Sequence, residues 1–219
     1  MYSSVCSSNI LSIDPTIDPA ILSMKIIALT GFMGCGKSSV GRRLSELLCC
    51  PYMDLDAVIE ERTGRSIPEI FASDGEAAFR QMELEALQSV VMNNSSSAIT
   101  GNPPAVILSK AKDLPTILSL GGGTVMTPEC ASLVHEKTLC IYLRTSVDTL
   151  VSRLCSEAAG RPMLNPGRTP HGTLRTRIES LMSLRASTYE RTAHLTLDTD
   201  GHTIDSLAQV LANEIDANR

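Results

Sequence analysis

The chain has 219 residues, 43% of them hydrophobic and 20% charged, which suits one compact domain with a buried core rather than a disordered or fibrous protein. Aromatic residues make up only 3% and include no Trp, which argues against a protein that stacks nucleobases or sugars on aromatic side chains. Because 19 Lys and Arg face 24 Asp and Glu, the net charge of −5 favours neither a nucleic acid nor a membrane surface as a partner.

The cysteines and the apolar runs indicate the compartment. The seven Cys are odd in number and contain no C-x-x-C pair, so we expect neither a disulfide framework nor a zinc site. No apolar run approaches the roughly 18 to 20 residues of a membrane span, and residues 1–23 do not resemble a signal peptide. We therefore expect a cytoplasmic protein.

The N-terminal half begins with a segment that looks irregular. Residues 1–23 are rich in Ser and contain two Asp-Pro pairs, so we predict a disordered or non-native tail, with Met24 as the alternative start of a single domain over 24–219. A buried strand is predicted at Met24–Thr30 and an amphipathic helix from Lys37. A short strand follows at Pro51–Asp54, and a Ser-x-x-Glu capping box at Ser66 starts a further helix.

Residues 93–115 interrupt this alternation. They are polar and contain Pro where a connection of 2 to 6 residues is typical, so we predict an insertion that forms a surface loop. The alternative is a strand at Ala105–Ser109 within it.

The C-terminal half alternates strands and helices again. Residues 156–171 contain repeated Gly and Pro and are predicted to form a flexible lid. The pattern predicts a three-layer α/β/α domain with a parallel sheet, whose ligands bind at the carboxyl ends of the strands. The predicted strands are Thr116–Leu120, Thr138–Leu143 and His194–Leu197, and the predicted helices start near Thr127, Thr145, Leu174 and Ile204.

Gly31–Ser38 (GFMGCGKS) matches the phosphate-binding pattern G-x-x-x-x-G-K-[ST] between a predicted strand and a predicted helix. Backbone N–H groups and the helix N-terminus attract phosphate, Lys37 adds a positive charge, and the Ser38 hydroxyl can bind Mg²⁺. The loop therefore predicts binding of a nucleoside triphosphate. Because the chain has no N-K-x-D sequence and no basic patch, a GTPase and a nucleic-acid motor are not favoured.

The second predicted strand ends in Asp54-Leu55-Asp56. Residues two apart in an extended segment point to one side, so we expect both carboxylates to face the ligand crevice. One could hold Mg²⁺ or its waters, and the other could accept the proton of an attacking hydroxyl. The alternative is that Asp54 only caps the following helix.

Arg80 and the Gly121–Gly123 triplet are expected at the same edge of the sheet. The guanidinium group of Arg is suited to binding a carboxylate. Three residues without side chains allow the backbone to approach a ligand closely. An exposed, solvated Arg80 is the alternative interpretation.

Five motifs in this order resemble shikimate kinase: GFMGCGKS, DLDAVIEERTGRSIPEIFASDGEAAFR, LSLGGGTV, GRPML, and an Arg followed by Tyr-Glu-Arg in the helix from Leu174. The resemblance runs from about Met24 to the final helix. It implies a nucleoside-monophosphate-kinase-like fold with five parallel strands in the order 2-3-1-4-5. It also implies a monomer that transfers the γ-phosphoryl group of ATP to the 3-hydroxyl of shikimate, with Mg²⁺, in chorismate and aromatic amino-acid biosynthesis.

The resemblance assigns roles residue by residue. Asp56, Lys37 and Arg161 are implied to be catalytic, with Arg161 on the lid reaching the ATP phosphates. Shikimate is implied to contact Asp56, Arg80, Gly122 and Arg185, the two arginines holding its carboxylate. The implied ligands of ATP are Gly34, Cys35, Gly36, Lys37, Ser38, Ser39 and Arg161, and those of the metal are Ser38 and Asp54.

Two alternatives stay open at this point. One is a related small-metabolite kinase such as gluconate kinase, which the pair of arginines and the Gly triplet disfavour. The other is a protein that binds nucleotide but has lost phosphoryl transfer, with the insertion and the tail as the unusual features.

Overall fold

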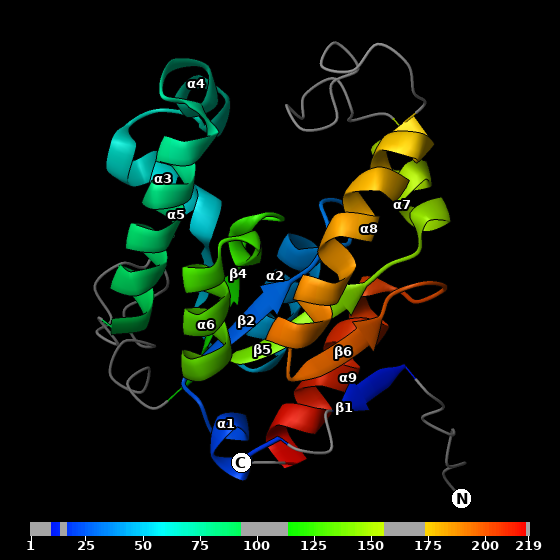
Figure 1. The fold of residues 1–219 in the computed structure, drawn as a ribbon. Helices are drawn as coiled ribbons and strands as arrows, with labels where there is room; N and C mark the ends of the chain where they lie inside the picture. The colour runs from blue at the N-terminus through cyan, green and yellow to red at the C-terminus, as the bar shows by residue number, and fades with distance from the viewer. Residues whose placement is uncertain (1–9, 14–16, 93–113, 156–173, 218–219) are drawn as a thin grey trace, which may run out of the picture.

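A six-stranded sheet forms the centre of the computed structural model, which describes residues 10–13, 17–92, 114–155 and 174–217 (Figure 1). The strand order is β1-β6-β5-β2-β4-β3. All strands except β1 run parallel, and their order confirms the predicted 2-3-1-4-5 arrangement. The parallel strands are β2 (Ile26–Thr30), β3 (Tyr52–Asp54), β4 (Thr116–Ser119), β5 (Leu139–Arg144) and β6 (Leu195–Asp198).

The sixth strand comes from the segment predicted to be a disordered or non-native tail, and the described residues of that segment form a strand and a short helix instead of disorder. β1 (Leu11–Ile13) pairs antiparallel with β6, and α1 (Pro19–Leu22) follows it. One of the Asp-Pro pairs starts this helix instead of breaking structure, because the Asp18 side chain caps the Ala20 N–H and Pro stands at the first helical position. Residues 1–9 and 14–16 lie outside the described part.

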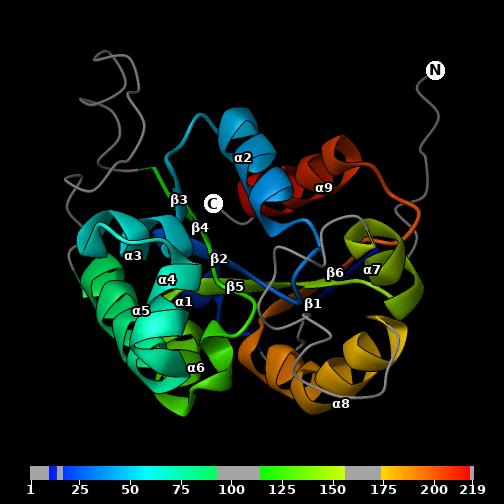
Figure 2. The same ribbon diagram turned by 90° about the horizontal axis from the view of Figure 1, so that it is seen from above.

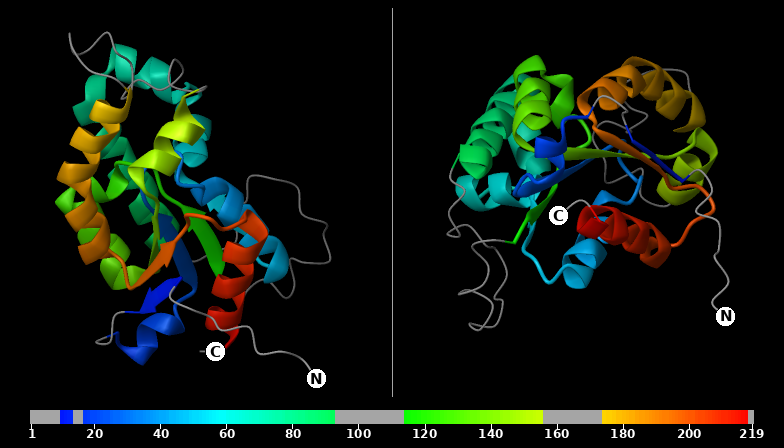
Figure 3. Two further views of the ribbon diagram at one scale, coloured as in Figure 1. Left: turned by 90° about the vertical axis from the view of Figure 1, so that its right-hand side faces the viewer. Right: turned by 90° about the horizontal axis from the view of Figure 1, so that it is seen from below.

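Helices cover both faces of the sheet, as the alternating pattern predicted. α2 (Lys37–Leu47) packs against α9 (Ile204–Ala217) on one face (Figure 2). The other face carries α5 (Gly75–Met92), α6 (Pro128–Lys137) and α8 (Leu174–Thr192), and both layers are also seen from below in Figure 3. Every residue of β2 is buried between the layers, in a core that is mostly aliphatic.

Two groups of helices rise beyond the carboxyl ends of the strands (Figure 1). On one side lie α3 (Leu55–Thr63), α4 (Ile67–Ser73) and the start of α5; on the other lie α7 (Val147–Leu154) and the start of α8. The predicted capping box of α4 is confirmed, since Glu69 accepts the Ser66 N–H at 2.8 Å. A 3₁₀ turn, η1 (Thr124–Met126), follows β4.

Two predicted segments fall partly or wholly outside the described residues. Of the predicted insertion, residues 93–113 are not described, and neither is the predicted lid with Arg161.

The six cysteines in the described part are free thiols. None of the helices described combines the length and hydrophobicity that crossing a membrane requires.

The contact between α2 and β3 leads to a prediction about Gly41. A Cβ atom at this helical position would lie 2.8 Å from Cε2 of Tyr52 and 3.1 Å from Cδ1 of Leu29. Although Ala is the better helix former, we expect Gly41→Ala to lower the free energy of unfolding by about 1–3 kcal/mol through overpacking. Urea denaturation measures the change. A more stable variant would contradict the close packing of α2 on the sheet.

Candidate active site

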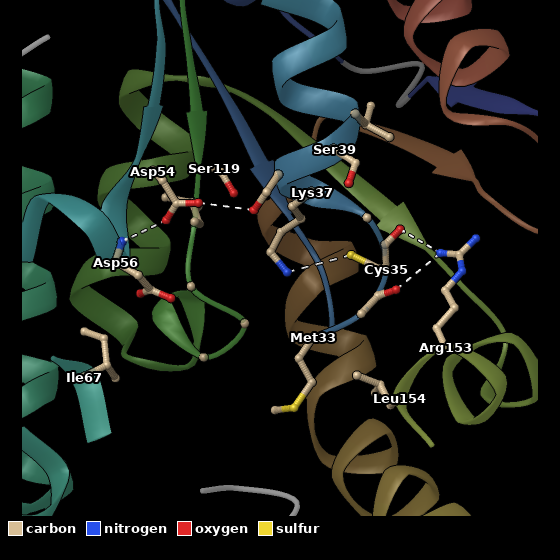
Figure 4. A pocket seen from close by; sticks show the side chains of 18 of the residues that line it. Met33, Cys35, Lys37, Ser39, Asp54, Asp56, Ile67, Ser119, Arg153 and Leu154 are labelled. Atoms are coloured by element: carbon tan, nitrogen blue, oxygen red, sulfur yellow. Dashed lines mark hydrogen bonds between the residues drawn. The ribbon is translucent and has the colours of Figure 1, made fainter. Parts of the chain in front are cut away.

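A cleft of about 740 Å³ opens at the carboxyl ends of β2, β3 and β4, between the two raised groups of helices (Figure 4). It brings together every residue of the predicted site that the structure describes, whereas Arg161 lies outside the described part. The predicted residues that line it are Gly34, Cys35, Gly36, Lys37, Ser38, Ser39, Asp54, Asp56, Arg80, Gly122 and Arg185.

The phosphate loop has a backbone that only glycine adopts without strain. Gly34 and Gly36 have φ angles of 81° and 103°, and Gly36 is the N-cap of α2. The helix therefore starts at Lys37 with its N-terminus directed at the cleft, where an anion would meet the partial positive charge and the N–H groups of the first turn.

Lys37 spans the inside of this loop. Its Nζ donates to Gly31 O at 2.8 Å and to Phe32 O at 3.1 Å, and only 9% of the residue is exposed. Cys35 Sγ lies 3.8 Å away on the same side (Figure 4). The ammonium group is thus held at the centre of the predicted phosphate site, where its charge is weakly screened by water.

Asp54 joins the phosphate loop to β3. One of its carboxylate oxygens accepts hydrogen bonds from Ser38 Oγ and from Tyr52 OH, each at 3.2 Å. The other oxygen accepts the Asp56 N–H at 3.1 Å, so Asp54 is also the N-cap of α3. Ser38 and Asp54, the two residues expected at the metal, are thus in contact, and Asp54 also caps the following helix.

Asp56 lies on α3, which corrects the expectation that it continues the strand. The chain turns at Asp54 because the capping bond starts the helix there, and Asp56 enters the cleft from the first helical turn. Its buried Oδ1 has no hydrogen-bond partner among the described residues. Burial, together with the negative charges of Asp54 and Glu83, raises its pKa from 3.8 to about 6. This carboxylate is therefore well suited to take up a proton near neutral pH.

Arg80 lines the cleft on the same side as Asp56 and is held there by two acids of its own helix. Its guanidinium pairs with Glu83 and, at 3.1 Å, with Glu76. Glu83 is only 1% exposed and also accepts a 2.6 Å hydrogen bond from Thr124 Oγ1. Burial alone would lower the pKa of Arg80, but the two carboxylates raise it above its ordinary value. The side chain is therefore a fixed cation facing the cleft, and not the solvated surface charge of the alternative interpretation.

Each glycine of the triplet after β4 gives room to a different part of the site. A Cβ atom at Gly121 would lie 2.9 Å from both Asp56 Oδ1 and Glu83 Oε1. At Gly122 it would lie 3.2 Å from the backbone N of Met33 in the phosphate loop, and at Gly123 only 2.6 Å from a guanidinium nitrogen of Arg80. The turn therefore contacts both carboxylates, the phosphate loop and the arginine.

Arg185 reaches the same turn from α8. The residue is 8% exposed, and its Nη1 lies 3.5 Å from Gly122 O. Arg80 and Arg185 thus lie on either side of the glycine triplet and supply two fixed positive charges. Such a pair can bind one carboxylate from two directions.

Sequence reasoning missed two charged residues of the cleft. Arg153 donates from Nη1 to Gly34 O at 3.3 Å and to Cys35 O at 3.2 Å (Figure 4). Its position in the last turn before the Gly- and Pro-rich segment was the available signal. Glu83 could have been found because it is an acid on the apolar face of α5, three residues after Arg80.

The family model and the curated relatives of this chain name one family. The family model for shikimate kinase matches residues 33–103 and 104–216. A shikimate kinase from Chlorobium phaeobacteroides is 34% identical over 87% of this chain and 90% of its own length, and one from Thermus thermophilus is 36% identical over 86% and 89%. The solved structure of an Acinetobacter baumannii shikimate kinase in complex with shikimate has a TM-score of 0.73 and 28% identity, covering 91% of this chain and 97% of that one.

The raised pKa of Asp56 leads to a prediction about stability. Since the folded pKa of about 6 exceeds the unfolded value of 3.8, ionised Asp56 destabilises the fold above pH 6, and the penalty disappears as the pH falls from 6 to 4. We expect Asp56→Asn to be more stable than the wild type by about 2 kcal/mol at pH 8, where the wild-type carboxylate is charged. Chemical denaturation at pH 8 and pH 4, without nucleotide or metal, measures the difference. If Asp56→Asn raised the free energy of unfolding equally at both pH values, the charge of Asp56 would not be the cause.

Proposed function

Because this chain belongs to the shikimate kinase family, we propose that its cleft binds Mg·ATP beside shikimate and transfers the γ-phosphoryl group to the 3-hydroxyl. The products are shikimate 3-phosphate and ADP, in chorismate and aromatic amino-acid biosynthesis. The observation that carries the proposal is the meeting of the phosphate loop, Asp56 and Arg80 around one glycine turn. The comparisons do not favour the gluconate kinase alternative, since both sequence relatives and the structure with shikimate carry the same family name.

The phosphate loop would hold ATP. Its N–H groups and the N-terminus of α2 suit the phosphates of the nucleotide, and Lys37 would move from its backbone carbonyls to the phosphate oxygens. Arg161 of the Gly- and Pro-rich segment is proposed, from the motif alone, to add a second positive charge. Cys35 belongs to the same loop and Ser39 to the first turn of α2, and both would contact the phosphates through the backbone.

Ser38 and Asp54 are proposed as the residues that hold Mg²⁺. Their oxygens are hard donors 3.2 Å apart, which suits this ion. Within the described ranges, no group of three or more His, Cys, Asp or Glu could hold a metal, so phosphate oxygens and water would complete the shell. Bound Mg²⁺ would neutralise charge on the phosphates.

Asp56 would orient the attacking hydroxyl of shikimate and take its proton, and Arg80 and Arg185 would bind the carboxylate of the same molecule. The free Oδ1 of Asp56 supports the first role, and the fixed guanidinium groups support the second. A monomer is proposed as the active form, because the described residues of the cleft form a complete acceptor and phosphate site within one chain, and a cytoplasmic location is proposed with it.

The test is ADP release with Mg·ATP and a panel of shikimate, quinate, gluconate and AMP. We expect release with shikimate alone. Asp56→Asn should lower kcat by about 10²–10⁴-fold and leave binding of a non-hydrolysable ATP analogue intact, because the nucleotide contacts lie on the loop. Asp216→Asn, at an exposed position near the end of α9, is the control and should match the wild type. Release with gluconate, or normal turnover by Asp56→Asn, would contradict the proposal.

A further inference from the structure

Tyr189 forms a hydrogen bond with a residue of the site, although it does not itself line the cleft. It lies on α8 one turn after Arg185, so both side chains project from the same face of the helix. Its hydroxyl donates a hydrogen bond to Gly122 O, the same carbonyl that Arg185 Nη1 approaches at 3.5 Å. Two successive turns of α8 thus hold a single carbonyl of the glycine turn.

The surroundings of Tyr189 make it a rigid donor. The residue is fully buried, and its ring stacks on Tyr142 of β5 with the centroids 5.2 Å apart. Burial raises the pKa of Tyr189 well above its ordinary value, so the hydroxyl keeps its proton. Because the stacked ring between the sheet and α8 has little freedom to move, the hydroxyl stays within hydrogen-bond distance of Gly122 O.

A displacement of the glycine turn would also move the groups that pack against it, the Arg80 guanidinium among them. Gly123 lies so close to the Arg80 guanidinium that a methyl group there would overlap it, and Gly122 lies against Met33 N in the same way. Losing the Tyr189 bond would also leave Arg185 as the remaining partner of Gly122 O among the described residues. Arg185 would then be drawn toward the turn and away from a substrate carboxylate.

We propose that Tyr189 is a positioning residue, which fixes the glycine turn against Arg80 and keeps Arg185 available to the acid substrate. The proposal rests on the function proposed above for the cleft. It assigns to Tyr189 an effect on the acceptor and not on the nucleotide, since Lys37 and the loop are held by contacts of their own.

Tyr189→Phe is the direct test, because it keeps the ring and its stacking and removes only the hydroxyl. We expect the KM for shikimate to rise about five- to tenfold, the cost of one buried hydrogen bond, with the KM for ATP within about twofold of the wild type. Tyr142→Phe changes the other ring of the stack and is the matched control, which should leave the KM values for shikimate and for ATP unchanged. An unchanged KM for shikimate, an equal rise in the control, or failure of Tyr189→Phe to fold would overturn the proposal.

A second readout does not need activity. The chain has 14 Gly, so a ¹⁵N-glycine-labelled protein gives a simple amide spectrum in which the triplet can be followed. We expect the Gly122 and Gly123 signals to shift in Tyr189→Phe and to stay in place in Tyr142→Phe. Unshifted signals would overturn the positioning role. If Tyr189→Phe shows these shifts but the wild type phosphorylates no shikimate, the proposed function fails while the link between Tyr189 and the turn stands.

Discussion

The close approach of backbone to functional groups at Gly121–Gly123 is the constraint on which the site depends. The triplet comes shortly after β4, and the pairing of β4 with β2 and β3 therefore fixes its position. A Cβ atom on the turn would lie 2.9 Å from Asp56 Oδ1, 3.2 Å from Met33 N of the phosphate loop or 2.6 Å from a guanidinium nitrogen of Arg80. A parallel sheet brings strand ends to one edge, but only residues without side chains let the groups at that edge converge on one small cleft.

The buried acids of the cleft differ in chemistry because they differ in partners. Glu83 is paired with Arg80 and Thr124, and its charge serves to fix an arginine. Asp56 lies nearby, but its Oδ1 has no hydrogen-bond partner in the described part of the chain, and burial together with the neighbouring carboxylates raises its pKa. One acid is therefore structural, and the other is ready to exchange a proton with a hydroxyl. Environments that separate the roles of neighbouring carboxylates in this way are typical of catalytic sites.

The sequence predicted the parts of the molecule that depend on local pattern. The five parallel strands, the phosphate loop and the placement of Arg80 followed from periodicity, glycine spacing and the family motifs. β1 was not predicted, because its pairing with β6 depends on contacts more than 180 residues apart in a segment whose Asp-Pro pairs looked like breaks. The helical position of Asp56 was missed because the capping bond of Asp54 outweighed the extended pattern. Glu83 and Arg153 also bind groups on other elements, and the local sequence pattern signals the residues but not these distant partners.

The central claim is that one glycine turn serves both halves of the site, and Gly122→Ala tests it most directly. The added methyl group would lie 3.2 Å from Met33 N, so either the turn or the phosphate loop must shift. The account predicts a folded variant in which the affinity for an ATP analogue falls and kcat/KM for shikimate drops about tenfold or more, since small displacements of reacting groups are costly. A folded variant with both quantities at their wild-type values would contradict it.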